Sequence, residues 1–313
     1  MIPAAFMTEH LEEADVVLLG VPYEKTLSAM KGAADGPVAI CDQLKYQVED
    51  LDHRLFDLTE ERLIEMDDNQ DSFGLENIIK IHECHLKDVR RLNPEHMTQR
   101  VKHEALDFLE KGKFVVGLGG EHTVSLGLFS VVWELYKDIT VIVVDAHSDG
   151  RDDTADYDPK PKKLAHSTVI RRIRDMGVEI RQIGIRSMSS KELVHAARNG
   201  FKKDIFFARS WEGNFCKLLN SIKTENVYLS IDVDGFDPSV IPTTGTPEPG
   251  GLLWNPFMFF AKDLFASRNV RGFDLVEVSQ GDDFSVADRI RTAYNAALLI
   301  HQLLCYKFRK FCK

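Results

Sequence analysis

Three side chains of metal-binding type stand at alternate positions in the middle of the chain, namely Asp145, His147 and Asp149. They follow residues 141–144, a run of β-branched apolar residues typical of a strand buried on both faces. If the backbone stays extended beyond this strand, side chains two positions apart point to the same side. Because carboxylates and imidazoles are common metal ligands, the spacing predicts a metal site at the end of the strand.

The same arrangement recurs at the ends of two other predicted strands. Residues 227–231 lead into Asp232 and Asp234, and residues 114–118 lead through two glycines and a glutamate to His122. Polar groups that follow the strands of an open α/β sheet meet at the edge where ligands bind. The three strand ends together offer two imidazoles and four carboxylates as metal ligands: His122, Asp145, His147, Asp149, Asp232 and Asp234.

This set of donors favours particular metals and a particular chemistry. Six ligands exceed what one zinc ion usually takes, and an oxygen-rich set suits manganese or magnesium. Four carboxylates balance the charge of two divalent cations, and a pair of metals about 3.5–4 Å apart can activate a bridging water near neutral pH. The sequence therefore predicts a metalloenzyme that hydrolyses a bond to an electrophilic carbon or phosphorus.

Each motif also has a purely structural explanation. A pair such as Asp232 and Asp234 at a strand end often only caps the turn or helix that follows. The 145–149 motif favours a metal site more strongly than such a pair does, because two acids and an imidazole all need partners if they are buried. Agreement among three strand ends favours the metal site. His82 and His85, by contrast, lack the i, i+4 spacing of a helical zinc motif, so we predict surface or packing roles for them.

The rest of the chain alternates predicted strands and helices, which indicates an α/β fold with a mainly parallel sheet and helices on both faces. Strands are predicted at residues 15–22, 114–118, 141–144, 180–185, around 205, 227–231 and 270–278. Helices are predicted from Pro37 and at residues 123–137, 165–173, 191–198, 214–223, 256–266 and 286–304. Residues 47–71 are acidic and irregular, and residues 75–111 show helical periodicity broken near residues 93–94.

Length and composition limit the classes of protein. With 313 residues, 44% of them hydrophobic, the chain can bury one large core, and we predict a single domain over residues 1–313. The net charge of −10 and the pI near 5.6 argue against nucleic-acid binding, which needs a basic face. We find no leader, no apolar run of membrane-spanning length and no disulfide or zinc spacing among the five cysteines. These features predict a cytoplasmic protein with reduced thiols and no membrane partner.

Three motifs carry a resemblance to a known family. They are GGEH at residues 119–122, DAHSD at residues 145–149 and SIDVDGFDP at residues 230–238. They resemble the metal-binding motifs of the ureohydrolase family, which comprises arginase, agmatinase and their relatives, and similar segments extend from residue 20 to residue 278. The resemblance implies a three-layer α/β/α sandwich, two Mn²⁺ ions per subunit and hydrolysis of a guanidinium to urea and an amine. It also implies a homo-oligomer, such as a trimer or hexamer.

The resemblance further implies a role for each matched residue. One metal would be held by His122, Asp145, Asp149 and Asp234, and the other by Asp145, His147, Asp232 and Asp234. Glu277 matches the carboxylate that binds the guanidinium, and a carboxylate can accept paired N–H donors from that cation. His166 matches the proton shuttle to the leaving amine, a task for which an imidazole titrates in the right range. Without the family, a polar residue at the start of a helix explains His166 better than a catalytic role does, and Glu277 is explained as the partner of a nearby arginine.

The segment before His166 favours a decarboxylated substrate. Residues 157–166 lack the Asn- and Ser-containing loop with which arginases bind the α-amino acid group of arginine. Residues 165–172 and Glu121 instead look like their counterparts in agmatinases. The resemblance therefore implies agmatine, hydrolysed to putrescine and urea, as the guanidino substrate.

The loop at residues 150–164 leaves other substrates open. Its acids could attract the distal ammonium of agmatine, and its bases could instead meet the carboxylate of a guanidino acid or of formiminoglutamate. The acids are Asp152, Asp153, Asp156 and Asp158, and the bases are Arg151, Lys160, Lys162 and Lys163.

Two departures from the family pattern bear on the substrate pocket. Thr243 stands where a glycine is usual, and residues 279–283 replace a segment that usually contains proline. A side chain at position 243 could narrow the mouth of the site or change the backbone of its loop.

Arginine as substrate, a non-catalytic ureohydrolase-like subunit and a two-metal phosphoesterase remain the alternatives.

Overall fold

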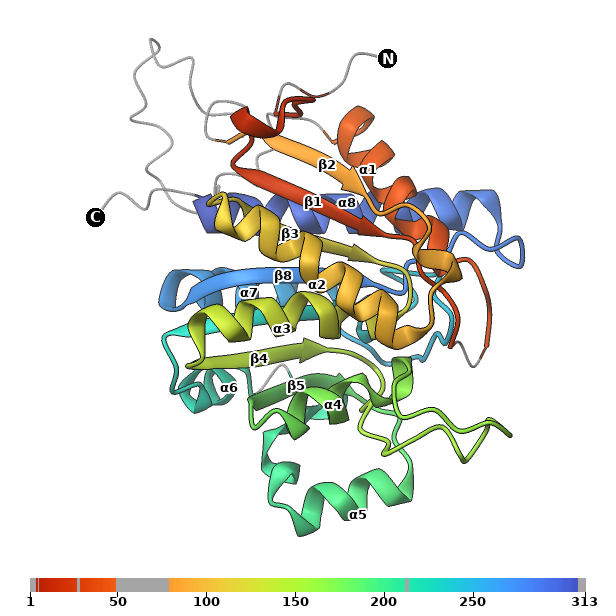
Figure 1. Cartoon of the computed structure of the whole chain (residues 1–313). Helices are drawn as coiled ribbons and strands as arrows, with labels where there is room; N and C mark the ends of the chain where they lie inside the picture. Colours follow the sequence, from red (N-terminus) through yellow and green to blue (C-terminus); the bar gives the residue numbers. More distant parts are fainter. Residues whose placement is uncertain (1–3, 5, 27–28, 49–78, 212–213, 309–313) are drawn as a thin grey trace.

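A computed structural model describes residues 4, 6–26, 29–48, 79–211 and 214–308 (Figure 1). The acidic segment predicted to be irregular, residues 47–71, lies outside these ranges except for its first two residues. In the described part of the chain, no helix is long and apolar enough to cross a membrane.

One sheet of eight strands forms the centre of the structure, and every pair of neighbouring strands is parallel (Figure 1). The order across the sheet is β2-β1-β3-β8-β7-β4-β5-β6. The strands are β1 Val16–Val21, β2 Ile81–His85, β3 Phe114–Gly119, β4 Ile139–Val144, β5 Glu179–Ile185, β6 Ile205–Phe207, β7 Asn226–Asp232 and β8 Asn269–Val276. The predicted parallel sheet is confirmed.

Helices cover both faces of this sheet, so the molecule has the predicted three layers (Figure 1). On one face lie α2 Pro94–Glu110, α3 Ser125–Tyr136 and α4 Val169–Asp175. On the other lie α1 Gly36–Tyr46, α6 Phe215–Ser221, α7 Trp254–Ser267 and α8 Val286–Phe308. The remaining helix, α5 Ser190–Arg198, packs beside β5 and β6 in a small separate cluster. Both faces of the central strands are therefore covered, which is why their sequences are continuous apolar runs.

The helical prediction for residues 75–111 is wrong in its first part. Ile81–His85 forms β2, an edge strand that pairs with β1 alone among the described strands. All but the first of its side chains are half-exposed, so the segment lacks the apolar run that marks a buried strand. The helix begins only at Pro94, where Asn93 caps it by accepting a hydrogen bond from the His96 N–H at 2.8 Å.

The four central strands, β3, β8, β7 and β4, bring distant segments of the chain together. The chain leaves β3, skips two places to β4, and only later fills the gap with β7 and β8. The register pairs Val144 with Ile231 and Asp232 with Val276, so the segments that follow these strands begin at one level. The crevice at the carboxyl ends of such strands is the usual ligand site of an open α/β sheet.

Candidate active site

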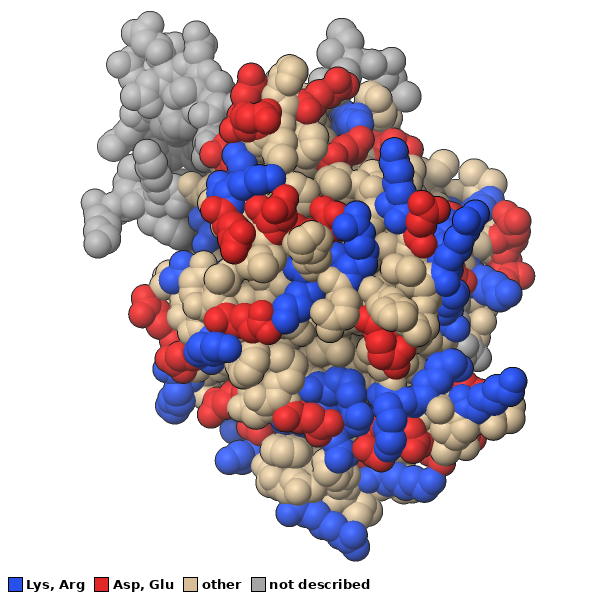
Figure 2. Space-filling view, in the orientation of Figure 1, with Lys and Arg blue, Asp and Glu red and all other residues tan. Residues whose placement is uncertain are grey.

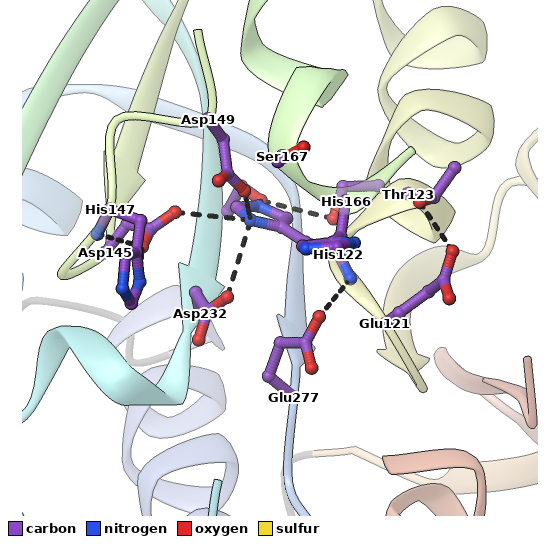
Figure 3. A network of polar contacts seen from close by, with 12 residues as sticks. Glu121, His122, Thr123, Asp145, His147, Asp149, His166, Ser167, Asp232 and Glu277 are labelled. Carbon is purple, nitrogen blue, oxygen red and sulfur yellow. Dashed lines mark hydrogen bonds and ion pairs between the residues drawn. The ribbon is translucent and has the colours of Figure 1, made fainter. Parts of the chain in front are cut away.

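The carboxyl ends of three central strands, β3, β4 and β7, hold all six predicted metal ligands. Figure 3 labels five of them: His122, Asp145, His147, Asp149 and Asp232. His122 begins the turn after β3, the 145–149 motif follows β4, Asp232 ends β7, and Asp234 lies in the turn after it. Five of the six are at most 6% exposed, and only His147 is partly accessible. The structure therefore buries a group of acids and imidazoles that the sequence places up to 112 positions apart, from residue 122 to residue 234.

These side chains form two groups that share one aspartate. His122 Nδ1 lies 3.1 Å from Asp149 Oδ2, 3.3 Å from Asp145 Oδ2 and 3.5 Å from Asp232 Oδ2. His147 Nδ1 lies 2.9 Å from Asp234 Oδ2 and 3.7 Å from Asp145 Oδ1. The family resemblance grouped Asp234 with His122, whereas here Asp232 lies beside His122, and Asp234 lies beside His147.

Two carboxylates at this site are buried among other acids, so their negative form is disfavoured unless a cation is present. Burial raises the pKa of Asp145 well above its usual value, and the charges of Asp149 and Asp234 raise it further. Burial likewise raises the pKa of Asp232, with Asp234 and Asp145 adding to the effect. Asp145 Oδ2 is buried, and no hydrogen bond reaches it from the described residues. A divalent cation would supply the missing positive charge, so the donor set fits a metal pair.

The two imidazoles respond to these carboxylates. Burial alone would lower the pKa of His147, but the hydrogen bond and charge of Asp234 outweigh it and raise the pKa to about 10. Hydrogen bonds and charges of Asp145 and Asp149 likewise overcome burial and raise the pKa of His122 well above its usual value. Both imidazoles must lose a proton before they can ligate a metal.

A buried network behind His122 sets the orientation of its ring. His122 Nε2 lies 3.2 Å from Ser230 Oγ, and that hydroxyl donates to Asp274 Oδ1 at 2.8 Å. Asp274 also accepts hydrogen bonds from Ser125 Oγ at 2.8 Å and Tyr228 Oη at 2.6 Å. Such partners fix the tautomer and direction of a ligating imidazole. This network was not predicted from the sequence, although Asp274 within the apolar strand 270–278 was a signal for it.

Glu277 lies directly after β8 and faces the same site (Figure 3). Its Oε1 accepts a hydrogen bond from the His122 N–H at 2.8 Å, and its own N–H donates to Gly120 O at 2.8 Å. Glu277 and Asp149 have left-handed backbones, with φ of 66° and 44°. That conformation costs about 1–3 kcal/mol for such residues and is concentrated at functional sites. Burial, aided by the charge of Glu121, raises the pKa of Glu277 well above its usual value.

A cavity of about 250 Å³ opens above these groups. Asp232, Asp234 and Glu277 line it together with His166, which starts the turn before α4. Arg151 lines it as well. The structure thus brings both predicted catalytic residues, His166 and Glu277, into one cavity with the two metal-ligand groups.

The acids of the 150–164 loop are paired with bases, mostly near the surface. On the face shown in Figure 2, acidic and basic side chains are intermingled. Asp156 lies 2.8 Å from Arg151 Nη1 and 2.5 Å from Lys191 Nζ. The other three acids have the following basic partners: Lys163 and Arg172 for Asp152, Lys163 for Asp153, and Lys162 for Asp158. The charges of this loop therefore balance one another, which weakens the case for them as an ammonium site.

The two departures from the family pattern contact each other. Thr243 is fully buried, and its hydroxyl donates to Ser279 O at 2.8 Å. Ser279 Oγ donates in turn to Lys31 O at 2.8 Å, and the Gln280 N–H donates to Gly32 O at 3.0 Å. The Thr243 side chain therefore secures the segment after β8 and is not turned toward the mouth of the cavity.

A third group of ligand-type side chains lies apart, between α1 and the edge strand β2. It consists of Cys41, Glu83 and His85. Lys45 Nζ lies 2.6 Å from Glu83 Oε1, so an ammonium already balances this carboxylate. We assign no metal to the group, and the surface or packing role of His85 stays a prediction.

Comparison with known proteins identifies the family. The sequence profile of the arginase family matches residues 14–305. The chain belongs to the arginase family. It is therefore an arginase-family ureohydrolase, in a family of binuclear metal enzymes that hydrolyse C–N bonds of linear amidines.

Individual relatives of this ureohydrolase carry two kinds of name. It is 30% identical over 312 residues to the N(1)-aminopropylagmatine ureohydrolase of Synechocystis sp., covering 94% of this chain and 89% of the relative. It is 32% identical over 288 residues to the agmatinase of Pyrococcus horikoshii, covering 91% of each chain. Among solved structures, a putative agmatinase from Clostridium difficile superposes with a TM-score of 0.77 at 27% identity, covering 96% of this chain and 99% of the other.

Proposed function

We propose that this ureohydrolase binds two Mn²⁺ ions and hydrolyses agmatine to putrescine and urea. One observation carries the proposal: two groups of metal-type donors share Asp145 at a cavity that also contains Glu277 and His166. Oxygen-rich donors with imidazole suit manganese. Relatives named agmatinase and the segment before His166 support agmatine as the substrate.

The ligands would divide as the geometry groups them. His122, Asp149 and Asp232 would hold one metal, His147 and Asp234 the other, and Asp145 would contribute one oxygen to each. When bound, such a pair supplies Lewis-acid activation of a water molecule for attack on the guanidinium carbon.

Glu277 and His166 would act on the substrate itself. Glu277 Oε1 is engaged by the His122 N–H, while Oε2 faces Gly245 in the cavity. The carboxylate can therefore orient a guanidinium by accepting its N–H donors. The positive guanidinium also favours the ionised form of a carboxylate whose pKa burial has raised. His166 would carry a proton to the departing amine.

The aminopropyl derivative of agmatine is the second candidate substrate. A relative that matches 94% of this chain is named for that activity. Both substrates present the same guanidinium to Glu277 and differ in the cationic tail, so the chemistry at the metals is common to them. Arg151, which lines the cavity, keeps a guanidino acid as a further compound to test.

The test is urea release from the manganese-loaded protein on agmatine, N(1)-aminopropylagmatine, arginine and guanidinobutyrate. Formamide release from formiminoglutamate is measured alongside. Preference for agmatine supports the proposal, preference for the aminopropyl compound selects the second candidate, and preference for an acid assigns Arg151 to carboxylate binding. Absence of turnover with all five compounds, despite two bound metals, contradicts the proposal.

A ligand variant provides the matching structural test. His147→Ala should lose metal and activity, whereas His103→Ala, which removes an exposed imidazole on α2, should keep both. Full manganese stoichiometry and activity in His147→Ala would contradict the assignment of the metal site.

Three predictions from the sequence stay proposals alongside this function. They are a single domain over residues 1–313, a homo-oligomer of three or six subunits, and a cytoplasmic location without nucleic-acid partners. Light scattering of the purified protein measures the subunit number, and a single unfolding transition in calorimetry would support one domain.

A further inference from the structure

Thr26 and Glu121 form a buried polar support behind His166. Glu121 is fully buried, and the Thr26 hydroxyl donates to its Oε1 at 2.6 Å. The backbone N–H groups of Lys25 and Thr26 both donate to its Oε2 at 2.6 Å, and Thr123 Oγ1 donates to Oε1 at 2.7 Å. Four donors thus converge on one carboxylate immediately before the predicted ligand His122, and Figure 3 shows the one from Thr123.

This support reaches His166 through a single hydroxyl. The His166 N–H donates to Thr26 Oγ1 at 3.0 Å, and His166 Nδ1 lies 3.3 Å from the same oxygen. A threonine hydroxyl has one hydrogen to donate and two lone pairs that accept. Because the Glu121 carboxylate takes the hydrogen, Thr26 can only accept from the imidazole. The ring nitrogen that faces Thr26 must therefore carry a proton.

We propose that Glu121 and Thr26 are positioning residues that hold His166 with its proton on Nδ1 and leave Nε2 as the nitrogen that exchanges protons with substrate. This inference deepens the proposed function and rests on it for the role of His166. The hydrogen-bond direction is set by Glu121, so the tautomer of the shuttle depends on a side chain that touches neither substrate nor shuttle. The backbone bond from His166 to Thr26 fixes the position of the ring as well.

The same contacts bring a segment from early in the chain to the site. The backbone N–H groups of residues 25–26 donate to Glu121, which lies just after β3. This places Thr26 against the turn at His166–Thr168, although Thr26 and His166 are 140 positions apart. On the opposite side, Tyr157 Oη lies 2.6 Å from Ser167 Oγ, and its ring centroid lies 6.3 Å from that of His166. The turn that begins at His166 is thus contacted by two segments, one containing Thr26 and the other containing Tyr157.

The test uses substitutions of nearly equal size. Thr26→Val removes the hydroxyl and keeps the shape of the side chain, and Thr26→Ser keeps a hydroxyl at this position. Thr224→Val is the control: it makes the same change at a threonine whose hydroxyl donates to Thr140 Oγ1 at the amino ends of β4 and β7, away from the cavity. Thr26→Val should lower kcat about 10- to 100-fold with little change in KM or manganese content, since it impairs proton transfer and not binding. Thr26→Ser and Thr224→Val should stay within about threefold of the wild type.

A double variant separates positioning from general stability. In a His166→Ala background, Thr26→Val should cause no further loss of activity, because Thr26 acts on the reaction only through the His166 ring that is already absent. A full additional loss there would mean that Thr26 acts apart from His166 and would overturn the inference. So would wild-type kcat in Thr26→Val.

A second readout needs no substrate. In magnesium-loaded protein labelled with ¹⁵N-histidine, the resonance lost in His166→Ala reports the tautomer of this ring. We expect the Nδ1–H form in the wild type and Thr26→Ser, and a mixture in Thr26→Val. A protein inert toward every guanidino compound but with this pattern would disprove the proposed function and the role of His166 as a shuttle, and would keep the assignment of its tautomer to Thr26 and Glu121. The Nε2–H form in the wild type would disprove the inference whatever the activity.

Discussion

Two regions of this protein are rich in aspartate, but their aspartates lie in opposite electrostatic surroundings. At the ends of the central strands, Asp145, Asp232 and Asp234 are at most 4% exposed and crowd against one another. In the 150–164 loop, Asp152 and Asp156 are exposed and lie against arginine and lysine side chains. The first region has too little positive charge of its own, and the second has enough.

The difference teaches where a ligand can be expected. Burial makes an unpaired carboxylate costly, so an uncompensated buried group is retained where a cation arrives to balance it. Exposed acids with nearby bases are screened by water and salt and gain little from any further cation. Counting acidic residues alone would have given both regions equal weight.

The largest expected effect comes from Asp145→Asn, because this aspartate belongs to both donor groups. Activity should fall about 1,000-fold or more, since metal assistance is worth several kcal/mol and each 1.36 kcal/mol is tenfold. Atomic absorption should show fewer than two metals per subunit. In the metal-free protein the variant should have a higher melting temperature than the wild type, because the change removes repulsion between Asp145 and the carboxylates of Asp149 and Asp234. A melting temperature lowered equally with and without metal would refute the idea that these carboxylates repel one another in the metal-free site.

Glu277→Gln tests the carboxylate that would meet substrate instead of metal. The amide keeps an oxygen to accept the His122 N–H but loses the charge that pairs with a guanidinium. We expect kcat/KM to fall about 100-fold with both metals retained, as for a charge-assisted hydrogen bond worth about 3 kcal/mol. Loss of metal in this variant would instead make Glu277 part of the metal site.

Removing the buried support of His122 should weaken metal binding without abolishing it. Ser230→Ala breaks the link from His122 Nε2 to Asp274. Such outer partners typically contribute 10- to 100-fold, that is roughly 1.4–2.8 kcal/mol, to metal affinity. Manganese titration of the purified variant measures the shift, and Ser239→Ala, which alters an exposed turn, is the control.

The charge imbalance also predicts that metal binding depends on pH. The pKa of His147 is raised from its usual value of 6.5 to about 10. In the metal-free protein this imidazole therefore stays protonated up to about pH 10, whereas an ordinary histidine is neutral above about pH 6.5. Metal must displace that proton, and affinity should therefore rise with pH, about tenfold per unit for each proton released. Calorimetry in buffers of different ionisation enthalpy counts the protons. Binding without proton release would contradict the raised pKa.

The smallest effect should come from the loop. Asp158→Asn makes the same chemical change as Asp145→Asn, but at an acid paired with Lys162 near the surface. Metal content should stay at two, and kcat should stay within about twofold of the wild type. A large loss of agmatine affinity in this variant alone would restore the loop as an ammonium site.

The sequence by itself determined the sheet core, the strand ends and the six metal-type residues. Continuous apolar runs mark strands covered on both faces, and acids or histidines directly after such runs are conspicuous. The edge strand β2 was missed because its polar side chains carry no such pattern. The helix after it was predicted from its periodicity, and Asn93 and Pro94, which were predicted to break that periodicity, are in fact its N-cap and first residue.

Only the tertiary structure decided which donors meet and what holds them. The strand order places β8 and β7 between β3 and β4, and this sets Asp232 beside His122 and Asp234 beside His147. It also decided that the loop acids find basic partners. The support of His166 by Thr26 and Glu121 spans chain segments with no shared pattern, because hydrogen bonds across a fold depend on distance and direction, which spacing along the sequence does not encode.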